Sequence, residues 1–214
     1  MNFLIKLKIY FVMFFFIIIH ELFHVLVGLC LKEKIDSIKL KPYGVNLRFK
    51  VNYDDYNKKI KKASMLTVKK IIIYSAGPFI NIVLFFVFLI GKMDIRIINI
   101  EITNEEILYS NLILGIFNIL PIYPLDGGRI VQEVVHIFCG LRKSYNVIQD
   151  VTWVTISIFT AFISVFILYY KNIVLLIVLV YLWILTIRSE KEFMLKEKIY
   201  QKLDNNVKLS RKKT

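Results

Sequence analysis

Cysteine, proline and histidine are scarce in this sequence of 214 residues, which has two, four and three of them respectively. Cys30 and Cys139 belong to no CxxC motif, which excludes a disulfide-stapled domain and a cysteine-ligated zinc site. We expect both to be small apolar packing residues. Because no Gly/Ser-rich or Pro-rich linker and no internal repeat is visible, the chain is expected to form one unit.

Charge is missing from long stretches of the chain. Hydrophobic residues make up 57% of it, and the mean hydropathy is +0.61. A helix needs about 20 apolar residues to cross a bilayer. Five blocks approach that length: residues 9–31, 71–91, 107–125, 151–170 and 172–187. The composition excludes an ordinary soluble domain and predicts an all-α polytopic membrane protein with about five transmembrane helices, or six.

Acidic residues are outnumbered by basic ones, which gives a net charge of +13. Residues 32–70, 126–150 and 188–214 carry 24 of the 29 basic side chains and share one side of the membrane if the five blocks alternate. Basic residues collect on the cytoplasmic side, so we expect a multi-pass protein of the cell membrane with a cytoplasmic C-terminus. The anionic headgroups of the lipid bilayer explain the excess of basic residues. Nucleic acid is not an expected partner, because no nucleic-acid-binding motif accompanies the basic residues.

Two segments outside the apolar blocks have their own patterns. Residues 35–51 hold a Pro-Tyr-Gly turn, after which apolar and polar residues alternate, and this predicts a β-hairpin or small sheet at the membrane after the first span. Residues 188–214 form a basic cytoplasmic tail with apolar residues at four-residue spacing. That tail is interpreted either as a helix on the anionic leaflet or as a solvated basic segment.

The first apolar block contains an unusual cluster of ionisable residues, "HELFH". Between Ile9 and Leu31 there is no Lys, Arg or Asp, yet His20, Glu21 and His24 lie in its interior. At 100° per residue the three share one helical face, with the imidazoles one turn apart and able to reach one metal ion. H-E-x-x-H on a helix is typical of zinc proteases, in which the glutamate is the general base. The alternative is a polar seam between packed helices.

A catalytic zinc site usually has three protein ligands, so a third is needed. Asp126 is a candidate, because it follows the third block in "NILPIYPLDGGRIV". Pro121 and Pro124 break the helix there, and Gly127 and Gly128 permit unusual backbone angles and close approach. A carboxylate on such a break can turn towards a metal, although a turn residue at the membrane interface is the simpler interpretation of Asp126 alone.

Together, these motifs resemble those of the site-2 protease family of intramembrane zinc metalloproteases. HELFH matches the family's HExxH, and Asn118, Pro121, Asp126 and Gly127 match its NxxPxxxxDG pattern. "SAGPFIN", residues 75–81, is similar to a small-residue motif on the span between the two. The resemblance implies a protease domain over residues 1–187, with one Zn²⁺ bound per chain. Its implied ligands are His20, His24 and Asp126, with Glu21 as general base and Asn118 beside the substrate backbone.

Within that family, "LKPYGVNLRF" and "NILPIYPLDGGR" are most similar to the sporulation members that release a sigma factor from its pro-sequence. The resemblance implies a membrane-associated protein substrate, a sigma-factor precursor, which would add as a strand to the hairpin at residues 35–51. Membrane proteins that regulate or inhibit the enzyme are further implied partners. Compared with those members, we expect one span fewer at the N-terminus and no C-terminal nucleotide-binding domain.

Two points complete the sequence-based expectations. His136 lies beyond Asp126 in a helix at the interface, and we interpret it as an interfacial or packing residue because three ligands are already assigned. The alternative function is a metal or ion transporter that uses the same histidines and aspartate. Transporters tend to have repeated halves with interrupted helices in matching positions, and this chain has a single broken span.

Overall fold

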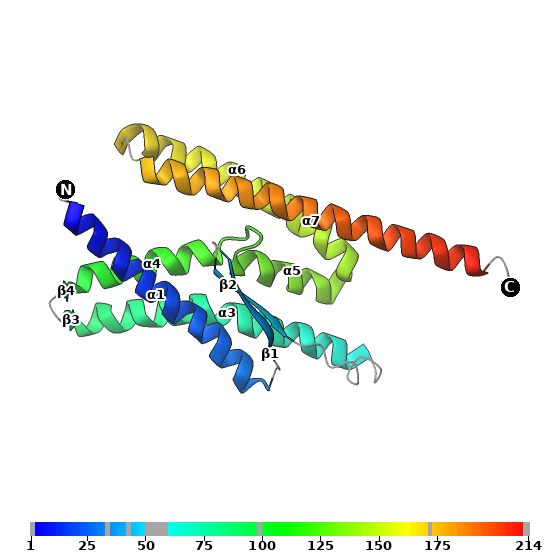
Figure 1. Ribbon diagram of the computed structural model, residues 1–214, viewed down its shortest axis with the longest axis horizontal. Coiled ribbons are helices and arrows are strands. Elements are labelled where there is room, and N and C mark those ends of the chain that lie inside the picture. Colours follow the sequence, from blue (N-terminus) through cyan, green and yellow to red (C-terminus); the bar gives the residue numbers. More distant parts are fainter. Residues whose placement is uncertain are drawn as a thin grey trace.

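The computed structural model describes residues 3–32, 35–41, 44–49, 60–97, 100–170 and 173–211, which form helices and two small β-hairpins (Figure 1). The helices are α1 (Phe3–Cys30), α3 (Ile60–Gly91), α4 (Asn104–Ile119), α5 (Asp126–Cys139), α6 (Leu141–Tyr170) and α7 (Ile173–Arg211). The strands are β1 (Ile35–Lys41), β2 (Gly44–Phe49), β3 (Ile95–Ile97) and β4 (Ile100–Ile102). The expected helical membrane protein with a small sheet is confirmed.

Four helices of the described chain are long and apolar enough to cross a membrane. Their candidate spans are Lys8–Cys30, Met65–Gly91, Leu141–Tyr169 and Ile173–Ile199. The third expected block coincides with α4, which has 16 residues and is shorter than a bilayer-crossing helix. The expectation of five spans with the stated boundaries therefore stays a prediction.

The helices form two groups that meet at α5 (Figure 1). Helix α1 crosses α3 and α4, which pack against each other, and α5 packs on α3. Helices α6 and α7 form a long hairpin that joins the first group through contacts of α6 with α5. Helix α7 continues without a break from the last expected span into the basic segment as far as Arg211.

The bounds of α4 follow from its sequence. At its start, Thr103 Oγ1 accepts a hydrogen bond from the Glu106 backbone N–H, and Glu106 Oε2 accepts one from the Thr103 backbone N–H. This capping box satisfies two donors that a helix start would otherwise leave unpaired. At its end, Pro121 cannot continue the helix, and a turn over residues 120–125 leads into α5. The predicted break before Asp126 is therefore present.

Strands β1 and β2 pair in antiparallel register, with Ile38 opposite Leu47 and Leu40 opposite Val45. The pairing shifts register between Ile35 and Ser37. The predicted hairpin is confirmed for these strands, whereas its turn at residues 42–43 and its end at residues 50–51 lie outside the described residues. A second hairpin, β3–β4, connects α3 with α4 and was not expected from the sequence.

Buried apolar side chains form two clusters. One joins α1, β4 and α4 through Val12, Phe16, Ile102, Ile107 and Leu114. The other joins the turn to the α6–α7 hairpin through Ile122, Leu125, Ile156 and Leu182. Burial of such side chains contributes about 1.5–3 kcal/mol each in water. The turn over residues 120–125 is thus fixed by apolar contacts to the hairpin.

The two cysteines do not pack in either cluster. Cys30 and Cys139 are both exposed, so the expectation that they are packing residues is wrong. Each is the last residue of its helix, α1 and α5 respectively.

Candidate metal centre

Helix α1 presents two imidazoles to the helices packed against it. His20 and His24 have exposed fractions of 3% and 5%, whereas the residues on either side of them in the helix are partly or largely exposed. Their ring centroids lie 4.9 Å apart with the planes at 82°. The four-residue spacing places both rings on the same face, as expected for an α-helix.

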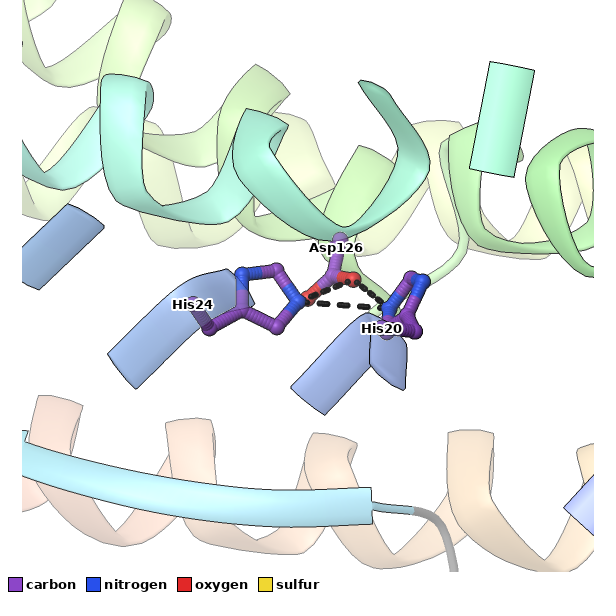
Figure 2. Close-up of side chains that lie close together, drawn as sticks. All are labelled: His20, His24 and Asp126. Carbon is purple, nitrogen blue, oxygen red and sulfur yellow. Dashed lines mark hydrogen bonds and ion pairs between the residues drawn. The ribbon is translucent and has the colours of Figure 1, made fainter. Parts of the chain in front are cut away.

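Asp126, the first residue of α5, completes the cluster (Figure 2). Its Oδ2 atom lies 3.0 Å from His20 Nε2 and 3.1 Å from His24 Nε2, and the two Nε2 atoms are 3.2 Å apart. The three buried side chains form a group that could hold a metal ion, with ligand atoms all within 4.8 Å of one another. Asp126 thus lies beside two histidines that precede it in the chain by 102 and 106 positions.

Two glycines after Asp126 allow this approach. Cβ atoms at Gly127 and Gly128 would overlap the backbone of Ile119 and Ile122, so only glycine lets α5 start this close to the end of α4. Both glycines lie inside α5, and Gly140 is the only described glycine with a positive φ. The expected close approach is therefore confirmed, but the expected unusual backbone angles are not found.

Helix α3 contacts the far side of both imidazoles. His24 Nδ1 lies 2.6 Å from the Ile73 carbonyl oxygen, and the side-chain amide of Asn81 lies 3.0 Å from His20 Nδ1. Between them, Gly77 faces the rings, and a Cβ there would overlap Nε2 of both histidines. Residues 73, 77 and 81 follow at four-residue intervals, so one face of α3 supports the whole histidine pair.

The hydrogen bonds define where the protons are. A carbonyl oxygen only accepts, so His24 Nδ1 carries its proton and a neutral His24 has a lone pair on Nε2. Burial alone would raise the pKa of Asp126, but its hydrogen bonds with His20 and His24 outweigh burial and lower that pKa below its usual value. Those hydrogen bonds require a proton on Nε2, and a cation that replaces such protons would bind the carboxylate and the Nε2 lone pairs together.

The donor set and its spacing fit zinc. Imidazole nitrogen and carboxylate oxygen are both zinc ligands, and ligands on a tetrahedron with bonds of about 2.0–2.1 Å are about 3.3 Å apart. The observed separations of 3.0, 3.1 and 3.2 Å agree with that spacing. Three protein ligands would leave one position open, as in catalytic rather than structural sites.

The other residues singled out in the sequence lie outside this cluster. Glu21 is half-buried on α1, and its charge acts on His24 and on Arg129. The side-chain amide of Asn118 donates to the Leu114 carbonyl oxygen of its own helix at 3.0 Å. His136 Nδ1 lies 3.4 Å from Glu133 Oε2 on α5, and His136 is not part of the three-residue group.

Sequence reasoning assigned no role to Gly77, Asn81 or Arg129. The first two belong to SAGPFIN, and their four-residue spacing indicates a shared helical face. Arg129 lies one turn after Asp126, with its guanidinium 5.4 Å from the centre of the Tyr74 ring, a cation–π distance. The pairing of α3 with α1 and α5, which gives these residues their neighbours, is not encoded in any local pattern.

Fold and site define a class: a multi-pass membrane protein with a buried group of two histidines and one aspartate suited to a metal. The profile of Peptidase family M50 matches residues 98–168, which include Asp126 but not the two histidines. Over 143 residues, 65% of the chain, the sequence is 31% identical to a zinc metalloprotease of Methanocaldococcus jannaschii. The chain spans 38% of the length of that relative.

A solved structure is similar over most of the chain. The site-2 protease from Methanocaldococcus jannaschii superposes with a TM-score of 0.60 and is 26% identical, covering 85% of this chain and 77% of that one. The chain is therefore similar to Peptidase family M50 over residues 98–168, and to a zinc metalloprotease and a site-2 protease over larger parts of its length.

Proposed function

We propose that this chain is an intramembrane zinc metalloprotease that hydrolyses a peptide bond of a membrane-associated protein substrate. Its zinc ligands are His20 Nε2, His24 Nε2 and one carboxylate oxygen of Asp126. The observation that carries the proposal is the convergence of these three atoms within 3.0–3.2 Å in a buried site. Buried ionisable groups at membrane depth are costly, so a cluster of them calls for a function.

Glu21 is the general base of the proposed reaction. Glu21 directly follows His20, is only partly buried, and its charge acts on His24, so it lies near enough to the cluster to take a proton from a water bound there. It takes the proton of that water and delivers it to the departing amine. Zinc, when bound, lowers the pKa of water towards about 7 and polarises the carbonyl of the substrate.

The substrate is an extended segment in or near the bilayer. Strands β1 and β2 form a two-stranded sheet, and an extended peptide can add to a free edge through main-chain hydrogen bonds. Such pairing keeps a transmembrane substrate unwound, since a helix hides its peptide bonds. Asn118, near the end of α4, is assigned to the substrate backbone in this proposal.

The resemblance to stage IV sporulation protein FB gives the substrate its candidate identity, a sigma-factor precursor of sporulation. Regulated intramembrane proteolysis of this kind requires membrane proteins that hold the enzyme inactive until needed. If the five apolar blocks alternate across the membrane, 24 of the 29 basic residues share the side of the tail, which supports a cytoplasmic C-terminus. The cleaved bond would then lie towards the cytoplasmic side.

The test combines zinc content with cleavage. The full chain is co-expressed with a membrane-linked fusion of a sigma-factor precursor, and the zinc content of the purified chain is measured. We expect Glu21→Gln to retain one zinc per chain while cleavage falls about 100- to 10,000-fold, the usual contribution of general acid–base catalysis. Glu133→Gln is the control, because it is the same substitution at a glutamate that instead pairs with Lys70 and His136.

Each result separates the alternatives. Absence of zinc from the wild-type chain would overturn the metal centre. Undiminished cleavage by Glu21→Gln would overturn the assignment of the general base. Zinc uptake into vesicles without any cleavage of the fusion would favour the transporter.

A further inference from the structure

The side chain of Asn81, on α3, hydrogen-bonds a histidine of the cluster. It is fully buried, and its amide nitrogen as placed lies 3.0 Å from His20 Nδ1. The amide oxygen is buried and makes no hydrogen bond to any described residue. Burying a polar group in this way costs about 1–3 kcal/mol, so an apolar residue would stabilise the helix packing better unless the amide has a task.

The orientation of this amide determines which nitrogen of His20 is free. If the amide NH₂ donates to Nδ1, the proton of His20 is on Nε2, and Nε2 cannot bind a metal. If the amide oxygen accepts from Nδ1–H, the lone pair of His20 is on Nε2, directed at Asp126 and His24. Oxygen and nitrogen of an amide are assigned from the hydrogen-bond network, and no second hydrogen bond holds this amide in either orientation.

His24 provides the internal comparison. Its Nδ1 faces the Ile73 carbonyl, which can only accept, so α3 already fixes the proton of one histidine on Nδ1. Asn81 lies two helical turns further along the same face of α3. An oxygen of Asn81 facing His20 would give the two histidines the same tautomer, with both Nε2 lone pairs directed at the centre of the cluster.

We propose that Asn81 is a positioning residue of the metal centre, whose amide oxygen accepts the Nδ1 proton of His20 and thereby fixes the Nε2 lone pair for zinc. The proposal rests on the proposed zinc site. Partners that orient ligating histidines in this way typically contribute 10- to 100-fold to metal affinity. Asn81 does not touch the reacting atoms, so its effect is on metal affinity first and on cleavage through it.

The experiment measures zinc affinity of the full-length chain in detergent by competition with a chelator. Asn81→Leu, which keeps the branched heavy-atom skeleton but removes the acceptor, is expected to weaken zinc binding about 10- to 100-fold. Asn81→Asp keeps an acceptor oxygen and is expected to bind zinc at least as tightly as the wild type. The visible spectrum of the Co²⁺-substituted chain should be unchanged in Asn81→Asp and altered in Asn81→Leu.

Asn111→Leu is the matched control, because Asn111 is also fully buried, and its amide donates only to the Ile107 carbonyl of its own helix. It should leave zinc affinity unchanged. If Asn81→Leu does not fold, Asn81→Ala removes the same acceptor without adding bulk. Wild-type affinity in a folded Asn81→Leu or Asn81→Ala, or equal losses in Asn81→Asp and Asn81→Leu, would overturn the proposal. A wild-type chain that binds no zinc would instead overturn the metal centre itself.

Discussion

In the region around the candidate metal centre, the residues of the cluster make polar contacts between helices, whereas two buried hydroxyls of α7 in the α6–α7 hairpin make them within their own helix. In the first region, His20, His24, Asn81 and Asp126 bond side chains or backbone of other helices. In the hairpin, Thr186 and Ser189 donate to carbonyls three or four residues earlier in their own helix. Polar contacts between helices specify one arrangement, whereas local ones leave the helix free to pack by shape.

The hairpin nevertheless reaches the site through the turn that carries Asp126. Thr152 Oγ1 accepts a hydrogen bond from the Tyr123 backbone N–H at 3.1 Å. The Phe193 ring lies 4.7 Å from the Tyr123 ring and 5.0 Å from the Tyr145 ring. We infer that the helices around the candidate metal centre fix the proposed ligands. The hairpin fixes the turn over residues 120–125, which joins two of those helices, α4 and α5. The comparison can therefore be tested by perturbing each region separately.

Gly77→Ala should have the largest effect, because it acts inside the first region. Its Cβ would overlap Nε2 of both histidines, and those rings are held by α1, so helix α3 must shift. We expect zinc affinity to fall more than about 100-fold, beyond the range of outer-shell substitutions, and cleavage to be lost. Chelator competition on the purified chain measures the first effect.

Gly115→Ala is the control for this substitution. Gly115 is buried on α4, but its Cβ would meet Asn81 Cβ and Ile82 Cγ1 at 3.6 Å, an ordinary contact distance. It should retain zinc. If Gly77→Ala and Gly115→Ala both bound zinc as tightly as the wild type, the close packing of α3 on the histidines would not be needed for zinc binding. The inference that the helices around the metal centre fix the ligands would then be wrong.

Phe193→Ala should have the next largest effect, because it loosens the hairpin from the turn. Phe193 is 4% exposed, and truncation of a buried phenylalanine costs about 3–5 kcal/mol in folded proteins. We expect a lower midpoint of chemical unfolding in detergent. Zinc affinity should fall by about tenfold at most, since the turn loses support but the ligands keep theirs.

Phe162→Ala provides the contrast within the hairpin, because Phe162 is 63% exposed and contacts Phe166 of its own helix. Little change in the unfolding midpoint is expected. A loss of zinc affinity in Phe193→Ala as large as that in Gly77→Ala would mean that the hairpin is an integral part of the metal centre. The two regions would then have to be treated as one.

The two regions also differ in how much of their structure can be predicted from the sequence. HELFH is recognisable from the sequence because two histidines and a glutamate fit one helical face, and Asp126 because prolines and glycines mark its turn. Asn81 is not, because its role depends on α3 packing against α1, which no local pattern encodes. In the hairpin, the charges beyond residue 187 suggested a separate tail, but lysine, glutamate and leucine are good helix formers, and α7 continues to Arg211.

The smallest effect is expected where the first region meets water. Lys8 Nζ on α1 lies 2.8 Å from Glu106 Oε2 in the capping box of α4. Burial alone would raise the pKa of Glu106, but the hydrogen bonds from Lys8 and Thr103 outweigh it and lower that pKa. A lowered pKa in the folded state means that the ion pair stabilises the fold above the unfolded-state pKa. This contribution is lost as the pH falls through the folded-state pKa.

Lys8→Met should therefore lower the free energy of unfolding by less than about 1 kcal/mol at neutral pH, because the ion pair is partly solvated. The difference from wild type should shrink towards zero as the pH falls below the unfolded-state pKa of glutamate, about 4.3, and through the lowered folded-state pKa of Glu106. Unfolding midpoints in detergent at several pH values measure it, with Lys143→Met, an exposed lysine of α6, as the control. A difference that stayed constant down to acidic pH would show that Lys8 stabilises α1 through its aliphatic stem rather than through the charge on Glu106.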